Sequence, residues 1–409
     1  MSDVERALEA VAPGPLIEDL AALVRIPSVT GAERPAMEHL AGRARDLGLT
    51  AVLREYDLAA LRADPGHPGE EAPRDELVGV IAGIAGPHAG TGPRLALCGH
   101  VDVVATGTVP WAHGNPFSGA IADGAVWGRG SVDMKAGVVA ALHALAAVLA
   151  AGVPLACRPE LLAVASEEDG GLGAFASLQD DDDYDACLIT EPTGFDVVCA
   201  QAGAITFRGV VRGAAAHAAH RLEGVSAVDR YVPIHLALQA LEDRLNAGVA
   251  EPLLAALPLP YPVNVGRVTA GDWPSSVPDR LEFHGRAPVR VGESAEVARQ
   301  AVREAIDGAC DDVELTWEGG QFASGRTPTD HPLAALVAGA ATETTGRPAG
   351  FTGVPWGADM RLFTERGIPT VMCGTPGIER SHAVDERVVI EDVLTLTRLL
   401  VRVLCAYGR

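Results

Sequence analysis

The run RLALCGHVDVV, residues 94–104, points to the architecture of this chain. Its apolar residues predict a buried strand that carries His100 and Asp102 near its end. Two more strands are predicted at 160–166 and 185–190, and an alanine-rich helix at 134–151 separates the first strand from the second. Strands that alternate with helices indicate a mostly parallel sheet with helices on both faces, so an α/β fold is predicted.

The same pattern extends towards both ends of the chain. Upstream, helices are predicted at 16–24 and 34–47, and an apolar run at 76–85 follows a Pro/Gly/Glu-rich segment, residues 63–74, that is expected to be a surface loop. Downstream, a helix, a strand and a final helix are predicted at 333–345, 368–373 and 391–407.

A different order of elements lies between these parts. The predicted elements are strand 206–211, helix 225–245, strands 263–270 and 280–289, helix 295–308 and strand 312–317. This β-α-β-β-α-β order is the ferredoxin-like arrangement, which can close on itself as a small domain. At 409 residues the chain is long for one compact domain. We therefore predict one domain made of residues 1–204 and 319–409, with a second domain inserted at 205–318.

Composition and charge exclude several classes of partner. The net charge of -22 argues against nucleic acid and against an anionic membrane surface. The seven cysteines are odd in number, widely spaced and mostly inside apolar runs, which indicates reduced, buried thiols. The N-terminus lacks the apolar region of a signal peptide, and no later apolar run is uninterrupted over a membrane length. A soluble cytoplasmic protein is predicted.

A scattered set of acids and imidazoles follows the predicted strands. The set is His100, Asp102, Asp133, Glu167, Glu168, Glu191 and His382. Folded together, five carboxylates and two imidazoles would repel one another unless cations neutralised them. Two divalent metals would do so. Oxygen-rich ligation with one imidazole per metal suits zinc, cobalt or manganese.

Each of these residues could also have an ordinary structural role. Asp102 lies two residues after His100, so it could accept the other ring N–H of that histidine, although an isolated His-x-Asp is more often part of a core. Asp133 opens the alanine-rich helix and could be no more than a cap. The adjacent Glu167 and Glu168 project in different directions, so one could bind metal while the other faces substrate, but a solvated turn is the alternative.

The ordered series of motifs resembles the dinuclear metallohydrolases of the M20 peptidase family, on the side of acetylornithine deacetylase and succinyl-diaminopimelate desuccinylase. The motifs that carry the resemblance are residues 99–104, residues 127–137, Glu167-Glu168, Glu191-Pro192-Thr193, Ala216-His217, and His382 followed by Glu386. Each motif alone is weak evidence, whereas the series in this order covers most of the chain.

The resemblance implies a role for each residue. One metal would be held by His100 and Glu191 and the other by Glu168 and His382, with Asp133 bridging the two. By the same likeness, Glu167 would be the general base and would pass its proton to the leaving amine. His217 would reach the active site of a neighbouring subunit and help to hold the oxyanion, so a homodimer is implied.

The resemblance also indicates where substrate would bind. Arg286 would pair with a substrate carboxylate, although without the family likeness it could equally be a surface arginine at a strand edge. The loop with Gly374, Thr375 and Gly377 would offer backbone N–H groups, and Arg361 is a further candidate.

Two departures from the family pattern leave the substrate open. WPSSVP at 273–278 replaces an Asn-Val-Val-Pro segment, and VPWGAD at 354–359 replaces a stretch of small residues. We therefore predict an amidohydrolase that removes an acetyl, succinyl or formyl group from an N-acyl amino acid. The alternatives are a metallo-exopeptidase that cleaves dipeptides or short peptides, and a non-catalytic binding protein with a hydrolase fold.

Overall fold

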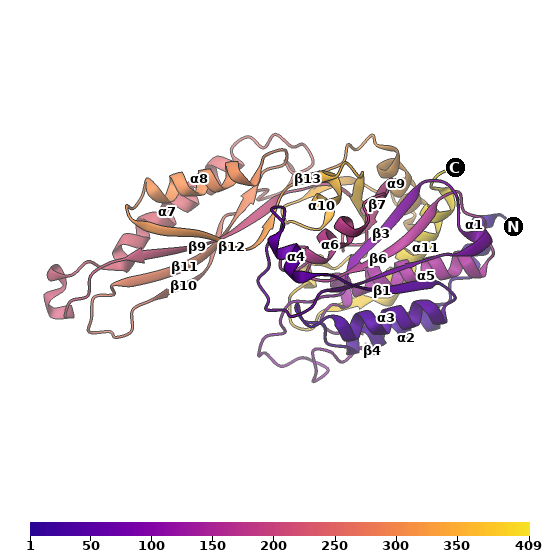
Figure 1. Ribbon diagram of the computed structural model, residues 1–409, viewed down its shortest axis with the longest axis horizontal. Helices are drawn as coiled ribbons and strands as arrows, with labels where there is room; N and C mark the ends of the chain where they lie inside the picture. Colours follow the sequence, from indigo (N-terminus) through magenta and orange to yellow (C-terminus); the bar gives the residue numbers. More distant parts are fainter.

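The computed structural model describes residues 1–409 apart from the side chain of Pro87, and it has a large part and a narrow smaller part (Figure 1). The strands of the large part are β1 (Thr50–Glu55), β2 (Val78–Gly83), β3 (Arg94–His100), β6 (Arg158–Val164), β7 (Ala186–Ile189), β8 (Val197–Gln201), β13 (Gly325–Arg326), β14 (Phe351–Val354) and β15 (Thr370–Met372). They form one mixed sheet in the order β1-β2-β6-β3-β7-β15-β8-β13, with β14 paired to β8.

The centre of this sheet is parallel, as the α/β prediction requires. Strand β3 pairs in parallel with β6 on one side and with β7 on the other, and β7 pairs in parallel with β15. The flanking strands β2 and β8 run antiparallel to this centre. The predicted α/β class is therefore confirmed. The predicted strand 94–104 ends earlier, at His100, because Val103 leaves the sheet and donates its backbone N–H to Ser28 instead.

Helices cover both faces of the sheet. They are α1 (Asp3–Glu9), α2 (Pro13–Arg25), α3 (Arg34–Asp46), α4 (Leu58–Ala63), α5 (Ala136–Ala150), α6 (Leu172–Asp180), α9 (Pro332–Thr345), α10 (Met360–Glu365) and α11 (Ile390–Ala406). In Figure 1, α6 and α10 lie in front of the sheet, while α5 and α11 lie behind it. A small sheet of β4 (Ala120–Ala122), β5 (Ala125–Trp127) and β16 (Arg387–Val389) lies beside these layers.

Helix α5 is apolar on all sides because it is the central helix of the core. Its side chains are almost all alanine, valine and leucine, and nearly every one is buried. The segment Ser131–Ala150 is long and apolar enough to cross a membrane, contrary to the expectation that no such run exists, but 89% of its most apolar window is buried inside the protein. Such all-round hydrophobicity is also typical of a helix enclosed in a large core.

The smaller part has the predicted ferredoxin-like order. Its elements are β9 (Gly203–Arg212), α7 (Ala227–Asn246), β10 (Asn264–Ala270), β11 (Arg280–Val289), α8 (Ala295–Asp307) and β12 (Val313–Phe322). The strands form an antiparallel sheet in the order β10-β11-β9-β12. Helices α7 and α8 bury Ile234 and Val302 against Phe207 and Phe283 of the sheet. We call this part the small domain.

The segment 63–74 is only partly the surface loop that was predicted. Arg74 is buried, and its guanidinium lies 3.2 Å from Asp169 Oδ1 and 3.4 Å from Glu33 Oε1. Farther along, the backbone N–H of Gln321 on β12 donates to the carbonyl of Pro68. The carboxylates of Asp169 and Glu33 compensate the buried charge of Arg74 and tie the segment to the large part. The contact of Pro68 with Gln321 ties it to the small domain.

Candidate active site

A cavity of about 440 Å³ opens where the parallel strands end. His100 is the last residue of β3, while Glu167 and Glu191 follow β6 and β7. The carboxyl ends of parallel strands lie at one edge of a sheet, which is where ligands bind in α/β folds. Asp133 comes from the irregular turn η2 (Ser131–Lys135) before α5, and His382 comes from the loop between β15 and β16.

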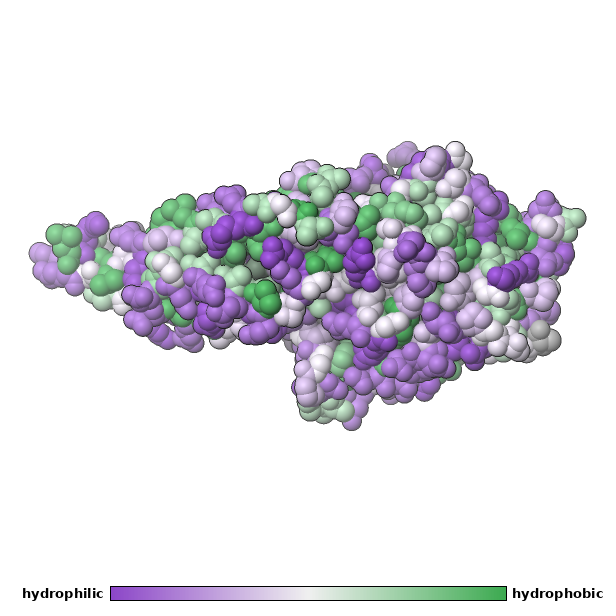
Figure 2. All heavy atoms as spheres, turned by 90° about the horizontal axis from the view of Figure 1, so that it is seen from above, coloured by the Kyte–Doolittle hydropathy of each residue, from purple (hydrophilic) through white to green (hydrophobic). Residues whose placement is uncertain are grey.

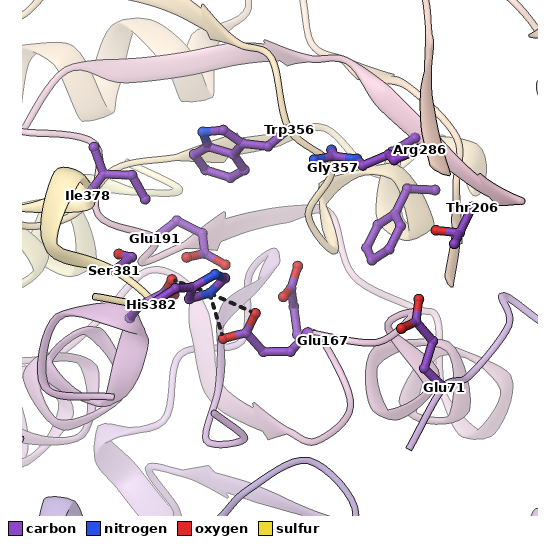
Figure 3. Close-up of a pocket in the computed structure, with 14 residues that line it drawn as sticks. Glu71, Glu167, Glu191, Thr206, Arg286, Trp356, Gly357, Ile378, Ser381 and His382 are labelled. Carbon is purple, nitrogen blue, oxygen red and sulfur yellow. Dashed lines mark hydrogen bonds and ion pairs between the residues drawn. The ribbon is translucent and has the colours of Figure 1, made fainter. Parts of the chain in front are cut away.

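Asp133 lies between the two imidazoles. Its Oδ1 is 3.2 Å from His100 Nε2 and its Oδ2 is 3.6 Å from His382 Nε2. Each imidazole also has a glutamate nearby: Glu191 Oε1 lies 3.8 Å from His100 Nε2, and Glu168 Oε2 lies 3.0 Å from His382 Nε2. Figure 3 shows His382 linked to its acidic neighbours, with Glu191 above them and Glu167 to one side. All five residues that were expected to bind metal therefore meet in one place.

Asp102 does not hold His100 in the predicted way. The ring Nδ1 of His100 lies 2.9 Å from the backbone carbonyl of Asp102 and 3.5 Å from its carboxylate. The carboxylate instead accepts the backbone N–H groups of Glu167 and Glu168, both at 3.1 Å. Two convergent N–H donors from a tight turn satisfy a fully buried carboxylate. Asp102 therefore positions the Glu167-Glu168 turn as well as the histidine.

A buried ion pair connects the two loops that carry Asp133 and His382. Arg129 Nη1 lies 2.8 Å from Glu386 Oε2, and Arg129 also donates to the backbone carbonyl of His382 at 3.0 Å. Glu386 accepts the backbone N–H of Val132 at 3.0 Å. Sequence reasoning included Glu386 in the family pattern but gave neither residue a role. The arginine in the glycine-rich segment GRGSVD was the available signal.

The electrostatics of the cluster favour bound cations. Burial raises the pKa of Glu167 and of Glu191 well above the usual range, and it also raises the pKa of Glu168. Burial alone would lower the pKa of His100, but the adjacent Asp102 and Asp133 outweigh it and raise that pKa well above its usual value. Without cations, such a cluster can be neutralised only by binding protons. The oxygen and imidazole donors suit zinc, cobalt or manganese.

The donor set can hold two cations. Ligand atoms of His100, Asp133 and Glu168 lie within 4.8 Å of one another, as do those of His100, Glu167 and Glu191. Glu167 is thus near enough to be a ligand itself. Its Oε2 is 4.0 Å from His100 Nε2, nearly as close as Glu191 at 3.8 Å, whereas at the second imidazole the contact comes from Glu168. The family resemblance places Glu167 outside the ligand set. Figure 3 shows the Glu167 carboxylate directed into the open cavity.

Glu167 is held rigidly although it is close to the cavity. It is 8% exposed, and its backbone N–H is fixed by Asp102. The preceding Ser166 has a φ of 65°, in the left-handed region that non-glycine residues rarely adopt. Such strained backbone is often found at functional sites.

The predicted substrate contacts are only partly brought together. Arg286 on β11 reaches the cavity from the small domain. Arg361 does not line the cavity: it is 1% exposed, donates to the carbonyls of Ala358 and Gly170, and lies over the ring of Phe322. Its bonding groups are therefore engaged in supporting the wall of the cavity. Substrate contact by Arg361 stays a prediction that this geometry does not favour.

The loop after β15 reaches the cavity through its later residues. Gly374 N donates to the hydroxyl of Thr193 at 3.1 Å, and the carbonyl of Thr375 accepts the N–H of Gly194. Gly377 has a φ of 120°, which favours glycine. Ile378 and Ser381, which sequence reasoning missed, line the cavity beside His382. Contacts from Gly374, Thr375 and Gly377 to substrate stay predictions.

His217 lies outside the cavity. It is exposed in the loop between β9 and α7 of the small domain, and its Nδ1 accepts the N–H of Ala219. Trp273 is likewise exposed, whereas Trp356 lines the cavity. Sequence reasoning also missed Glu71, Thr206 and Phe322, which line the cavity from three separate segments.

Comparisons with known proteins agree with this geometry. The model for "Peptidase family M20/M25/M40" matches residues 96–406. A succinyl-diaminopimelate desuccinylase of Methylorubrum extorquens is 29% identical to this chain, and the match covers 94% of this chain and 97% of the relative.

Solved structures share the fold. An M20 family metallo-carboxypeptidase of Sulfolobus solfataricus has a TM-score of 0.77 at 16% identity, covering 96% of this chain and 99% of the other. A dinuclear metal-binding peptidase from the M20 family of Bacillus subtilis has a TM-score of 0.63 at 18% identity, covering 96% of this chain and 97% of the other. The chain therefore belongs to peptidase family M20/M25/M40 and is a metal-dependent hydrolase of amide bonds.

Proposed function

We propose that this protein removes a small acyl group, which is acetyl, succinyl or formyl, from the nitrogen of an amino-acid-like substrate. The observation that carries the proposal is the division of labour among the acids. Asp133 and Glu191 lie 3.2 and 3.8 Å from His100 Nε2, and Glu168 lies 3.0 Å from His382 Nε2. Glu167 lies 4.0 Å from His100 Nε2, but its carboxylate faces the cavity and its backbone is fixed by Asp102. A carboxylate beside a cation site but outside the ligand set is suited to general-base work.

The residues have distinct roles in this proposal. His100 and Glu191 would hold one divalent cation, Glu168 and His382 the other, and Asp133 would reach both. When bound, such cations supply Lewis-acid activation of water and of the amide carbonyl. Glu167 takes the proton from water and delivers it to the leaving nitrogen.

A homodimer is part of the proposal because His217 has no place in the cavity of its own chain. It stands exposed on the small domain, and in this proposal it would contact the active site of a second copy. Helix α7 carries the exposed apolar residues Val228, Val232 and Leu236, and β10 is a largely exposed edge strand. Figure 2 shows apolar side chains on the surface of this narrow part. Exposed apolar surface and a free strand edge both favour association.

Cytoplasmic location is also part of the proposal. Six of the seven cysteines are buried free thiols, and Cys310 is half-buried. Thiols persist in the reducing cytoplasm. The expectation of zinc, with cobalt or manganese as alternatives, rests on the mixed oxygen and imidazole donors.

A metallo-exopeptidase is the second candidate. The free guanidinium of Arg286 at the cavity suits the carboxylate of a dipeptide as well as that of an N-acyl amino acid. The relative of known structure from Sulfolobus solfataricus is a metallo-carboxypeptidase, which favours keeping this candidate. Turnover of either substrate class would eliminate a purely non-catalytic binding protein.

Substitution of Glu167 tests the proposed function most directly. Metal-reconstituted protein is assayed against N-formyl, N-acetyl and N-succinyl amino acids and against dipeptides. We expect Glu167→Gln to lower kcat by about 100-fold or more, because general acid–base catalysis contributes that much, while both metal equivalents remain. The matched control, Glu168→Gln, should instead lose metal. Normal turnover by Glu167→Gln would show that the mechanism is wrong.

A further inference from the structure

Glu71 is a carboxylate in the cavity to which neither the metal cluster nor the proton transfer gives a role. It comes from the segment 63–74 and lines the same cavity as Glu167 and Arg286. Figure 3 shows its carboxylate pointing towards Thr206, on the side of Glu167 that is remote from His382. It therefore faces the space that substrate would enter, away from the proposed cations.

The backbone of Glu71 is fixed beside the catalytic turn. The N–H groups of Glu71 and Ala72 donate to Asp169 Oδ2 at 3.0 and 2.8 Å. Asp169 directly follows Glu167-Glu168 and is paired with the buried Arg74 at 3.2 Å. The position of Glu71 relative to Glu167 is thus set by a short chain of hydrogen bonds.

The side chain of Glu71 is exposed to the cavity and lies against the backbone of Gly319. Gly319 has a φ of 67°, and a Cβ atom built on it would lie 2.3 Å from Glu71 Oε1. The next backbone N–H, that of Gly320, reaches the same oxygen at 3.4 Å. This long contact leaves most of the hydrogen-bonding capacity of the carboxylate open, since an ionised carboxylate can accept about four hydrogen bonds.

No cation pairs with Glu71 among the residues that the structure describes. The ion pairs of the neighbouring Glu70 show the contrast, because Glu70 Oε1 lies 2.5 Å from Arg62 Nε. The two basic side chains that line the cavity are Arg286 and His382, and His382 is paired with Glu168. Arg286 is therefore available for a substrate anion, and Glu71 is available for a substrate cation.

We propose that Glu71 binds an ammonium group of the substrate, so that the substrate is a small amide with a free ammonium as well as a carboxylate. This inference rests on the proposed function. Arg286 binds the carboxylate, Glu71 binds the ammonium, and the scissile amide lies near Glu167. An ammonium donates up to three hydrogen bonds, and charge-assisted bonds to a fixed carboxylate are stronger than neutral ones.

The test compares substrates that differ only in the ammonium. In the first pair, Nα-acyl-lysine carries an ammonium on the amine side of the scissile amide and Nα-acyl-norleucine carries none. In the second pair, glycyl-leucine carries an ammonium on the acyl side and acetyl-leucine carries none. We expect wild-type kcat/KM to be about tenfold or more higher for the ammonium member of one pair, since a hydrogen bond to a charged group contributes that much. The difference should reside mainly in KM.

Two variants assign the preference to Glu71. Glu71→Gln keeps an acceptor for Gly320 but should remove the preference, by raising KM for the ammonium member while the neutral member stays within about twofold. Glu70→Gln is the matched control from the same segment and should keep the preference. Equal hydrolysis within both pairs by the wild type, or equal slowing of both members by Glu71→Gln, would overturn the assignment.

A separate measurement distinguishes this inference from the proposed function. Binding of 6-aminohexanoate and of hexanoate, which differ only in the ammonium, to the metal-loaded wild type and to Glu71→Gln is measured by calorimetry. Weaker binding of 6-aminohexanoate alone to the variant supports the ammonium site even if no tested amide is hydrolysed, in which case the proposed function fails. Hydrolysis without any preference, and with equal binding of both carboxylates, overturns the ammonium site and leaves the proposed function standing.

Discussion

The large domain and the small domain hold their chemical groups in opposite ways. In the large domain, His100, Asp102 and Glu167 are buried, and neighbouring residues fix each of them. On the small domain, His217 is exposed and its polar contacts are local. A buried charged group is kept only where partners compensate for lost water, so the first region is pre-organised within one chain. Under the proposed function, the second region would become part of a site only when another subunit approaches it.

The largest effect that separates the two regions is expected at His217. His217→Ala should lower kcat by about 100-fold or more, the cost of losing an oxyanion donor, while metal content stays at the wild-type level. The matched control is His220→Ala, because His220 is exposed in the same loop with its ring centroid 6.2 Å from that of His217. Loss of metal together with activity would contradict the proposed separation.

Subunit mixing extends the same prediction. An equal mixture of His217→Ala and Glu167→Gln chains should recover about a quarter of wild-type activity, because half of the dimers are mixed and each has one complete site. Absence of any recovery after exchange of subunits would show that His217 does not act on the partner chain.

A smaller effect is expected at Arg129, which tests pre-organisation in the large domain. Arg129→Met leaves Glu386 buried without its cation and releases the carbonyl of His382. Residues that hold ligands typically change metal affinity by about 10- to 100-fold, so a loss of that size is expected in a competition titration with a chelator. Arg387→Met is the control, since Arg387 stacks on Trp127 without an ion pair to Glu386. Unchanged metal affinity in Arg129→Met would show that the loops carrying Asp133 and His382 do not depend on Arg129 for their position.

The smallest effect is expected on the pH dependence of stability, through the ion pairs of Asp19 with Arg43 and His143 between helices of the large domain. Burial alone would raise the pKa of Asp19, but His143 and Arg43 outweigh it, so the pKa is lower than usual. Arg43 Nε lies 2.8 Å from Asp19 Oδ1, and His143 Nε2 lies 2.9 Å from Oδ2. A lowered carboxyl pKa contributes stability above the unfolded-state pKa, and this contribution is lost as the pH falls through the folded-state value.

Asp19→Asn should therefore lower Tm at pH 7, and its difference from the wild type should narrow below about pH 4. Asp46→Asn, which removes a largely exposed partner of the same Arg43 at 3.1 Å, should change Tm little at either pH. A difference between wild type and Asp19→Asn that is constant across this range would contradict the assigned role of the ion pairs.

Much of the fold was predictable because its elements have strong local signals. The predicted strand 280–289 coincides with β11, and the predicted helices 34–47 and 295–308 match α3 and α8 to within one residue at each end. Short strands such as β8 and β13 were missed, because their pairing partners lie far away in the chain and their own periodicity is brief. The buried Arg74 was missed because its Pro/Gly/Glu-rich surroundings are typical of exposed loops.

The order of acids and imidazoles along the chain was sufficient to predict a cation cluster, because so many carboxylates brought together would repel one another unless cations neutralised them. Their spacing could not predict that the carboxylate of Asp102 would accept the N–H groups of Glu167 and Glu168, since that pairing depends on two distant loops meeting. The same holds for Glu71, whose side chain contacts Gly319 and Gly320, about 250 residues away in the chain. The sequence by itself determines which chemical groups are present and in what order. The partner of each polar group depends on which distant segments folding brings together.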